Sequence, residues 1–120
     1  MAHCIVSRVK PEELIAGQAQ ELRRGTVVLA CLGLLDEPQY GYALLETLNA
    51  AGIPVDGNTL YPLLRRLDKQ GLLVSEWNTD ESRPRKFYRT SPEGAVVRDG
   101  LLSEWRDLVA SIADITQEKS

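Results

Sequence analysis

The 120-residue chain has the length of one domain, and its 43% hydrophobic and 26% charged residues exclude a disordered or fibrous protein. No apolar run is long enough to span a bilayer, and the N-terminus lacks the pattern of a secretory signal, so we expect a cytoplasmic protein. The net charge is −3, but within residues 57–90 seven basic residues outnumber four acidic ones. Such a basic segment can direct one face toward phosphate, although a solvated surface has the same pattern.

The first part of the chain is predicted to be helical. A short helix is expected over residues 11–20, because a proline followed by two glutamates suits a helix start. Apolar residues then repeat at helical spacing over residues 21–35, with Gly25 as a candidate bend. A further helix is predicted over residues 40–51 and ends at Gly52.

The second part of the chain predicts a helix, a hairpin and a long final helix. Asp56 is the expected N-cap of a helix over residues 57–70, which has leucines on one face and polar and basic residues on the other. Two strands are expected over residues 72–78 and 85–90. A serine, a proline and a glutamate then begin a helix over residues 92–116.

This order of elements predicts a mainly α fold with a small β-hairpin: a winged helix-turn-helix followed by a C-terminal dimerisation helix. The alternative is an α+β domain whose helix has a basic face by coincidence. We divide the chain into a partly helical N-terminal extension (1–20), a winged helix-turn-helix DNA-binding domain (21–91), the C-terminal dimerisation helix (92–116) and a tail (117–120).

Five segments match the sequence motifs of a known family, in the same order along the chain: Leu22-Arg23-Arg24-Gly25-Thr26, Tyr40-Gly41-Tyr42, Thr59-Leu60-Tyr61-Pro62-Leu63-Leu64-Arg65-Arg66-Leu67, Gly71-Leu72-Leu73 and Pro84-Arg85-Lys86-Phe87-Tyr88. Over about residues 22–108 the chain resembles the PadR-like transcriptional regulators, in the branch with a single C-terminal helix. Asn58, Phe87 and Thr90 depart from the usual family residues. The resemblance implies a repressor that binds double-stranded DNA.

The helix over residues 57–70 is the expected DNA reader. In helix-turn-helix docking the first turns of the second helix meet base edges, where arginine can bind guanine and asparagine can bind adenine. The candidate DNA-binding residues are Asn58, Thr59, Tyr61, Pro62 and Arg65 at bases, Arg66 and Lys69 at phosphates, Arg83, Arg85 and Lys86 in the wing, and Tyr42 as a phosphate donor. Tyr61 could instead pack inside the protein, and Arg66 and Lys69 could serve solubility alone.

The last helix has an apolar seam at spacings of four, three, four and three, formed by Leu101, Trp105, Leu108, Ile112 and Ile115. The seam either packs on the protein's own core or forms a dimer interface. The resemblance favours a homodimer on an inverted-repeat operator, with the segment near residues 11–22 covering the partner's helix. It also implies that Trp105 binds a small aromatic or hydrophobic effector, although an interface tryptophan without a ligand is the alternative.

We therefore predict a sequence-specific transcriptional regulator that is a homodimeric repressor relieved by an effector. The alternative function is a winged-helix protein-interaction module that does not bind DNA. An enzyme is not expected, because the chain lacks a glycine-rich phosphate loop and paired intrahelical ligands. No cofactor or metal is expected, since Cys4 and Cys31 lack metal-site spacing, although His3 and Cys4 leave a makeshift metal site open.

Overall fold

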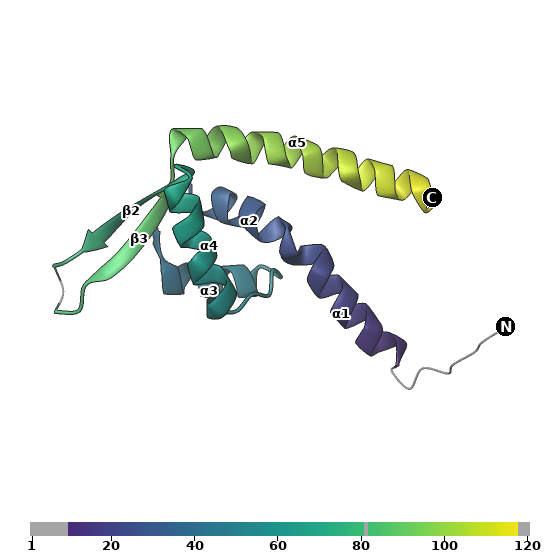
Figure 1. Cartoon of the computed structure of the whole chain (residues 1–120), viewed down its shortest axis with the longest axis horizontal. Helices are drawn as coiled ribbons and strands as arrows, with labels where there is room; N and C mark the ends of the chain where they lie inside the picture. The colour runs from purple at the N-terminus through teal and green to yellow at the C-terminus, as the bar shows by residue number, and fades with distance from the viewer. Residues whose placement is uncertain (1–9, 81, 118–120) are drawn as a thin grey trace.

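The computed structural model describes residues 10–80 and 82–117, which form five α-helices and one three-stranded antiparallel sheet. The elements are α1 (Pro11–Arg24), α2 (Thr26–Leu34), β1 (Gln39–Tyr40), α3 (Gly41–Ala50), α4 (Gly57–Lys69), β2 (Leu73–Asn78), β3 (Arg85–Thr90) and α5 (Pro92–Ile115). The sheet order is β1-β3-β2. Figure 1 shows a head made of α2, α3, α4 and the sheet, from which α1 and α5 extend toward the same side.

The core lies between α2, α3 and α4, and the sheet closes it. The leucines of the predicted α4 stripe are all buried, as expected: Leu60, Leu63, Leu64 and Leu67. They pack with Leu32 and Leu35 from α2 and with Leu44 and Leu48 from α3. Leu73 of β2 and Tyr88 of β3 complete the cluster. A winged helix-turn-helix fold, mainly helical, follows from this arrangement, as predicted.

Two predicted helix boundaries were wrong. The first helix does not end near residue 20 but continues to Arg24, because no residue between them breaks a helix. The break falls at Gly25, which separates α1 from α2 and keeps right-handed helical backbone angles. Tyr40 belongs not to a helix but to β1, where it pairs with Phe87 of β3. A strand of two residues is too short to show a periodicity, so no local pattern predicts it.

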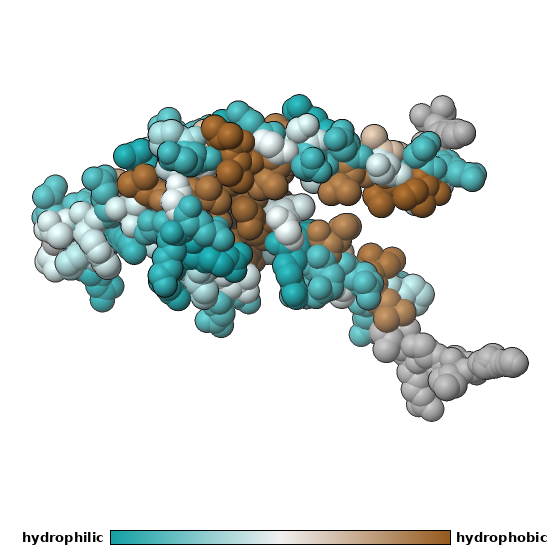
Figure 2. Space-filling view, turned by 45° about the horizontal axis from the view of Figure 1, so that its top comes forward, coloured by the Kyte–Doolittle hydropathy of each residue, from teal (hydrophilic) through white to brown (hydrophobic). Residues whose placement is uncertain are grey.

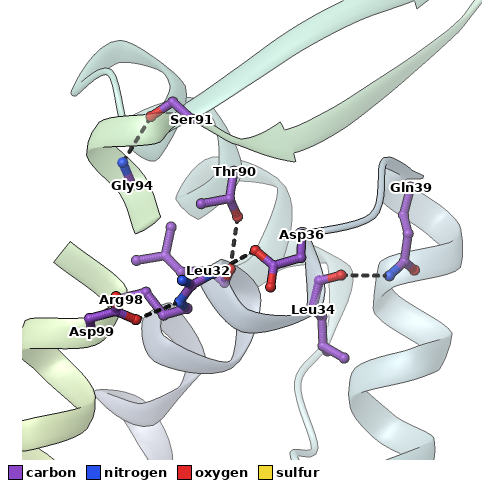
Figure 3. A network of polar contacts seen from close by, with 9 residues as sticks. All are labelled: Leu32, Leu34, Asp36, Gln39, Thr90, Ser91, Gly94, Arg98 and Asp99. Carbon is purple, nitrogen blue, oxygen red and sulfur yellow. Dashed lines mark hydrogen bonds and ion pairs between the residues drawn. The ribbon is translucent and has the colours of Figure 1, made fainter. Parts of the chain in front are cut away.

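The start of α5 is fixed to the head by hydrogen bonds (Figure 3). Ser91, the predicted N-cap, accepts a hydrogen bond from the Gly94 amide at 2.9 Å and donates one to the Gly71 carbonyl at 2.6 Å. Thr90 donates from its hydroxyl to the Leu32 carbonyl at 2.8 Å. The last strand and the final helix are therefore held in one orientation relative to α2.

An ion pair adds a second attachment one turn further along α5. Arg98 binds Asp36, which lies in the turn after α2, and also binds Asp99 at 3.0 Å. Both carboxylates are largely exposed, so water screens these contacts and their contribution to stability is small. Only the pair with Asp36 connects α5 to the head, because Asp99 belongs to α5 itself.

Cys31 is a core residue, and burial raises the pKa of its thiol from 9.0 to about 12. The thiol therefore ionises at a lower pH in the unfolded chain than in the folded one, so this residue's contribution to stability is lost as the pH rises above about 9.

The pH dependence of unfolding tests the burial of Cys31. The range is pH 8 to pH 10, roughly one unit either side of the ordinary thiol pKa of 9.0. Over this range we expect the urea midpoint of a Cys4→Ser variant to fall more steeply than that of a Cys4→Ser, Cys31→Ala variant. Rapid reaction of native Cys31 with a thiol reagent at neutral pH would contradict its burial.

Candidate nucleic-acid interface

The turn between α3 and α4 sets the angle of the helix-turn-helix. The side chain of Asn49 donates to the Val55 carbonyl at 2.9 Å and accepts from the Val55 amide at 3.3 Å. Gly52 has a φ of +91°, a conformation that side chains disfavour. Asp56 then caps α4, as predicted, by accepting a hydrogen bond from the Thr59 amide at 2.9 Å. These contacts fix where the first turn of α4 lies.

The outward face of α4 carries every residue predicted there to bind DNA. All seven are exposed, whereas the leucine stripe on the other side is buried: Asn58, Thr59, Tyr61, Pro62, Arg65, Arg66 and Lys69. Pro62 has no backbone N–H, so it cannot donate to the carbonyl of Asn58 within the helix. That carbonyl is left to bind water or a ligand at the exposed face.

Tyr61 packs inside the protein and is also partly exposed. A Cβ added to Gly41 would lie 3.2 Å from its ring, and a Cβ added to Gly57 would lie 2.9 Å from it. The ring therefore packs against the start of α3 and the start of α4. It stays 36% exposed, which leaves part of the ring at the surface of the reading helix.

A shallow groove of about 510 Å³ separates α4 from the wing. We call it the cationic groove, because four of its lining residues are basic and one is acidic: Pro62, Arg65, Arg66, Asp68, Lys69 and Lys86. The acidic residue, Asp68, forms an ion pair with the Lys86 ammonium at 3.9 Å. The remaining positive charge makes the groove suited to an anionic ligand.

The wing residues Arg85 and Lys86 lie on opposite faces of β3, because neighbouring side chains of a strand point to opposite sides. Arg85 donates to the Tyr42 hydroxyl at 2.8 Å and lies over the stacked rings of Tyr40 and Tyr42. The structure thus brings Lys86 to the α4 side and Arg85 to the start of α3. Arg83 is exposed near the tip of the hairpin.

Some side chains near this surface were not predicted. Arg23 and Arg24 at the end of α1 line a depression of about 470 Å³ together with Asp56 and Thr59, beside the start of α4. Trp77 of β2 is 62% exposed in the wing. The sequence pattern of two arginines directly before a glycine could have pointed to Arg23 and Arg24. No sequence pattern predicted that Trp77 would be exposed, because strand tryptophans are usually buried.

The terminal helices form a second, apolar surface. A cleft of about 770 Å³ lies between α1, α2 and α5, and we call it the terminal-helix cleft; its apolar lining includes Leu22, Leu29, Leu101, Trp105, Leu108 and Ile112. Leu101 packs on the head's own core, as one interpretation of the seam expected. The other four seam residues are exposed: Trp105, Leu108, Ile112 and Ile115.

The remaining sequence expectations concern metals and membranes. His3 and Cys4 lie outside the described residues, and so does Glu81 of the wing turn. Among residues 10–80 and 82–117, no three metal-binding side chains come together. No helix in the same part of the chain combines the length and hydropathy needed to cross a bilayer.

A winged helix-turn-helix fold can carry many functions, so the function has to be judged by comparison with known proteins. Residues 28–99 match the transcriptional regulator PadR-like family. The chain belongs to this family. A PadR-family regulator from Eggerthella lenta is 44% identical, with a TM-score of 0.85 over 90% of this chain and 96% of that one. A PadR-like transcription factor from Bacteroides fragilis is 31% identical, with a TM-score of 0.69 over 82% and 98% of the two chains.

The transcriptional regulator Rv3488 of Mycobacterium tuberculosis is also similar, at 40% identity over 76 residues, which cover 62% of this chain and 71% of that protein. This PadR-like protein is accordingly a transcriptional regulator and not an enzyme, as predicted. Its departures from the family have local explanations in two cases. Thr90 donates to the Leu32 carbonyl, and Phe87 packs edge-on against Tyr40 at 6.0 Å between ring centroids.

Proposed function

We propose that this PadR-like regulator is a homodimeric repressor that reads an inverted-repeat operator with α4 and the wing. The observation that carries the proposal is the two-sided character of α4, whose leucine stripe is buried while its polar and basic face is exposed beside the cationic groove. Helix-turn-helix proteins insert such a face into the major groove. The first turns, with Asn58 and Arg65, would meet bases, and Arg66 and Lys69 would meet phosphates.

Arg65→Ala is the test of direct readout. We expect the substitution to weaken binding to the operator by about 1–3 kcal/mol and to relax discrimination at one base position, because arginine binds guanine through paired hydrogen bonds. Fluorescence anisotropy with labelled duplexes measures both effects. Arg106→Ala removes another exposed arginine, on α5, and should leave binding unchanged. Unchanged operator affinity in Arg65→Ala would remove this residue from the readout.

The proposed homodimer rests on apolar surface that a single chain leaves uncovered. No residue of α1 is buried, and Leu14, Ile15 and Leu22 are exposed along it. Figure 2 shows hydrophobic residues on the side of α5 that faces α1. The radius of gyration is 18.4 Å, whereas a compact domain of this length has one of roughly 14 Å. A second copy would cover these faces.

We infer that the terminal helices of the second copy pack against the terminal-helix cleft. An amphipathic helix with an exposed apolar stripe needs a partner surface, and this cleft offers one between α1 and α5. A twofold axis through the interface would place two copies of α4 on successive turns of DNA, about 34 Å apart, which matches an inverted-repeat operator. Sedimentation velocity tests this proposal, and a monomer at micromolar concentration would contradict it.

An effector would bind in the same region. Trp105 lines the terminal-helix cleft beside Glu104, and stacking on an indole favours a planar aromatic or hydrophobic compound. Such a ligand relieves repression only if it binds the DNA-free form more tightly than the DNA-bound form. In a Trp77→Phe variant, quenching of Trp105 fluorescence measures ligand binding. A ligand that quenches Trp105 without releasing DNA would not be the effector.

A further inference from the structure

Trp77 occupies a defined place on the face of the wing that is turned toward α4. In the antiparallel register Trp77 pairs with Lys86, and Ser75 pairs with Tyr88, so these side chains share one face of the sheet. The Ser75 hydroxyl donates to the Asp68 carboxylate of α4, which shows that this face looks toward the reading helix. Tyr88 is buried there, whereas Trp77 is further toward the wing tip and 62% exposed.

Lys86 connects this tryptophan to the cationic groove. Its ammonium lies 5.8 Å from the centroid of the Trp77 ring and 5.5 Å from that of Tyr88, and 3.9 Å from Asp68. Lys86 also lines the groove with Arg65 and Arg66. The indole therefore forms the outer edge of a basic surface, and it does not line the terminal-helix cleft.

The chemistry of this edge suits the backbone of a nucleic acid. A phosphate would meet the basic side chains of the groove, and the apolar faces of its sugars would meet the indole ring. The indole N–H can only donate a hydrogen bond, and a phosphate oxygen accepts it. An aromatic ring beside the Lys86 ammonium also excludes water from an ion pair at that ammonium, which strengthens the pair.

We propose that Trp77 is a DNA-contacting residue of the wing, which packs on the sugar-phosphate backbone next to the phosphate bound by Lys86. This inference rests on the proposed DNA-binding function and adds a contact to it. The tryptophan contributes affinity that does not depend on base sequence, because the ring and its N–H meet only backbone groups.

The direct test follows the fluorescence of Trp77 in a Trp105→Phe variant, in which Trp77 is the only tryptophan. The probe is a fluorescein-labelled duplex from the region upstream of the coding sequence, and anisotropy records its binding in the same samples. We expect acrylamide to quench Trp77 at least about twofold less efficiently when the duplex is bound, because the backbone covers the ring. Binding of the duplex with unchanged quenching would overturn the inference and leave the regulator intact. Failure of the duplex to bind would overturn both.

Substitutions give an independent measurement. We expect Trp77→Ala to raise the Kd for the upstream duplex and for a shuffled duplex by a similar factor, roughly 3- to 10-fold. Trp77→Phe should lie between this variant and the unmodified protein, because it keeps a ring and loses the N–H. Val96→Ala removes another exposed apolar side chain, at 72% exposure on α5, and should leave both Kd values unchanged. An unchanged Kd in Trp77→Ala, with the fold verified by its thermal transition, would overturn the contact.

Discussion

Leu108→Glu is expected to convert the protein to a monomer and to weaken operator binding by about 100-fold or more. Leu108 is 60% exposed in the single chain and lines the terminal-helix cleft, so the substitution spares the head's core. In a dimer the same position would be buried, and an unpaired carboxylate there is strongly unfavourable. Losing the second reading head removes the avidity of two linked contacts, which is typically a factor of 10² to 10⁴. Sedimentation velocity and anisotropy measure the two effects.

Ser103→Glu is the matched control for this variant. Ser103 is exposed on α5 and lies about half a helical turn away from the apolar seam, so the same charge is added to the solvent face. Its assembly and DNA affinity should equal those of the unmodified protein. A Leu108→Glu protein that stays dimeric with unchanged affinity would show that α5 is not the interface.

Gly94→Ala is expected to destabilise the fold by about 2–3 kcal/mol, because the position has no space for a side chain. A Cβ there would overlap the Leu72 carbonyl oxygen and lie 2.9 Å from the Thr90 methyl group. The Leu72 carbonyl also accepts the Ser91 amide at 3.1 Å, so the backbone cannot move aside without weakening that bond. Urea denaturation monitored by circular dichroism measures the loss.

Gly100→Ala separates this clash from a general effect of glycine replacement in α5. No atom lies within 4 Å of a Cβ added at Gly100, and alanine favours a helix interior over glycine by about 1 kcal/mol. The control should therefore be as stable as the unmodified protein or up to about 1 kcal/mol more stable. Equal stability of Gly94→Ala and Gly100→Ala would mean that the start of α5 yields to a side chain.

The fold was predictable from sequence where periodicity and capping chemistry agree. The leucine stripe of α4, its Asp56 cap and the Ser91 cap of α5 all follow from local patterns and all occur. The break at Gly25 was harder to place, because a glycine inside a helical pattern marks either a bend or nothing. β1 exists only because tertiary pairing with β3 extends two residues, which no local pattern encodes.

The site was predictable only in part, for a related reason. Exposure of the α4 face follows from burial of the opposite stripe, so the exposed positions of Asn58 and Arg65 could be predicted from the sequence. The contact partners of the wing residues could not be predicted from the sequence. Arg85 lies on Tyr42, which is 43 positions away in the chain, and such long-range contacts leave no local signature. For the same reason the exposed place of Trp77 was visible only in the structure.

Salt-dependent DNA binding tests the central claim most directly. The measurement is a fluorescence-anisotropy titration of the unmodified protein against the duplex upstream of its coding sequence and a shuffled duplex, at low and at near-physiological salt. A repressor that contacts phosphates should bind the upstream duplex much more tightly than the shuffled one, and its affinity should fall steeply as salt rises. Equally weak binding to both duplexes, with little dependence on salt, would contradict the claim and favour a protein-interaction module.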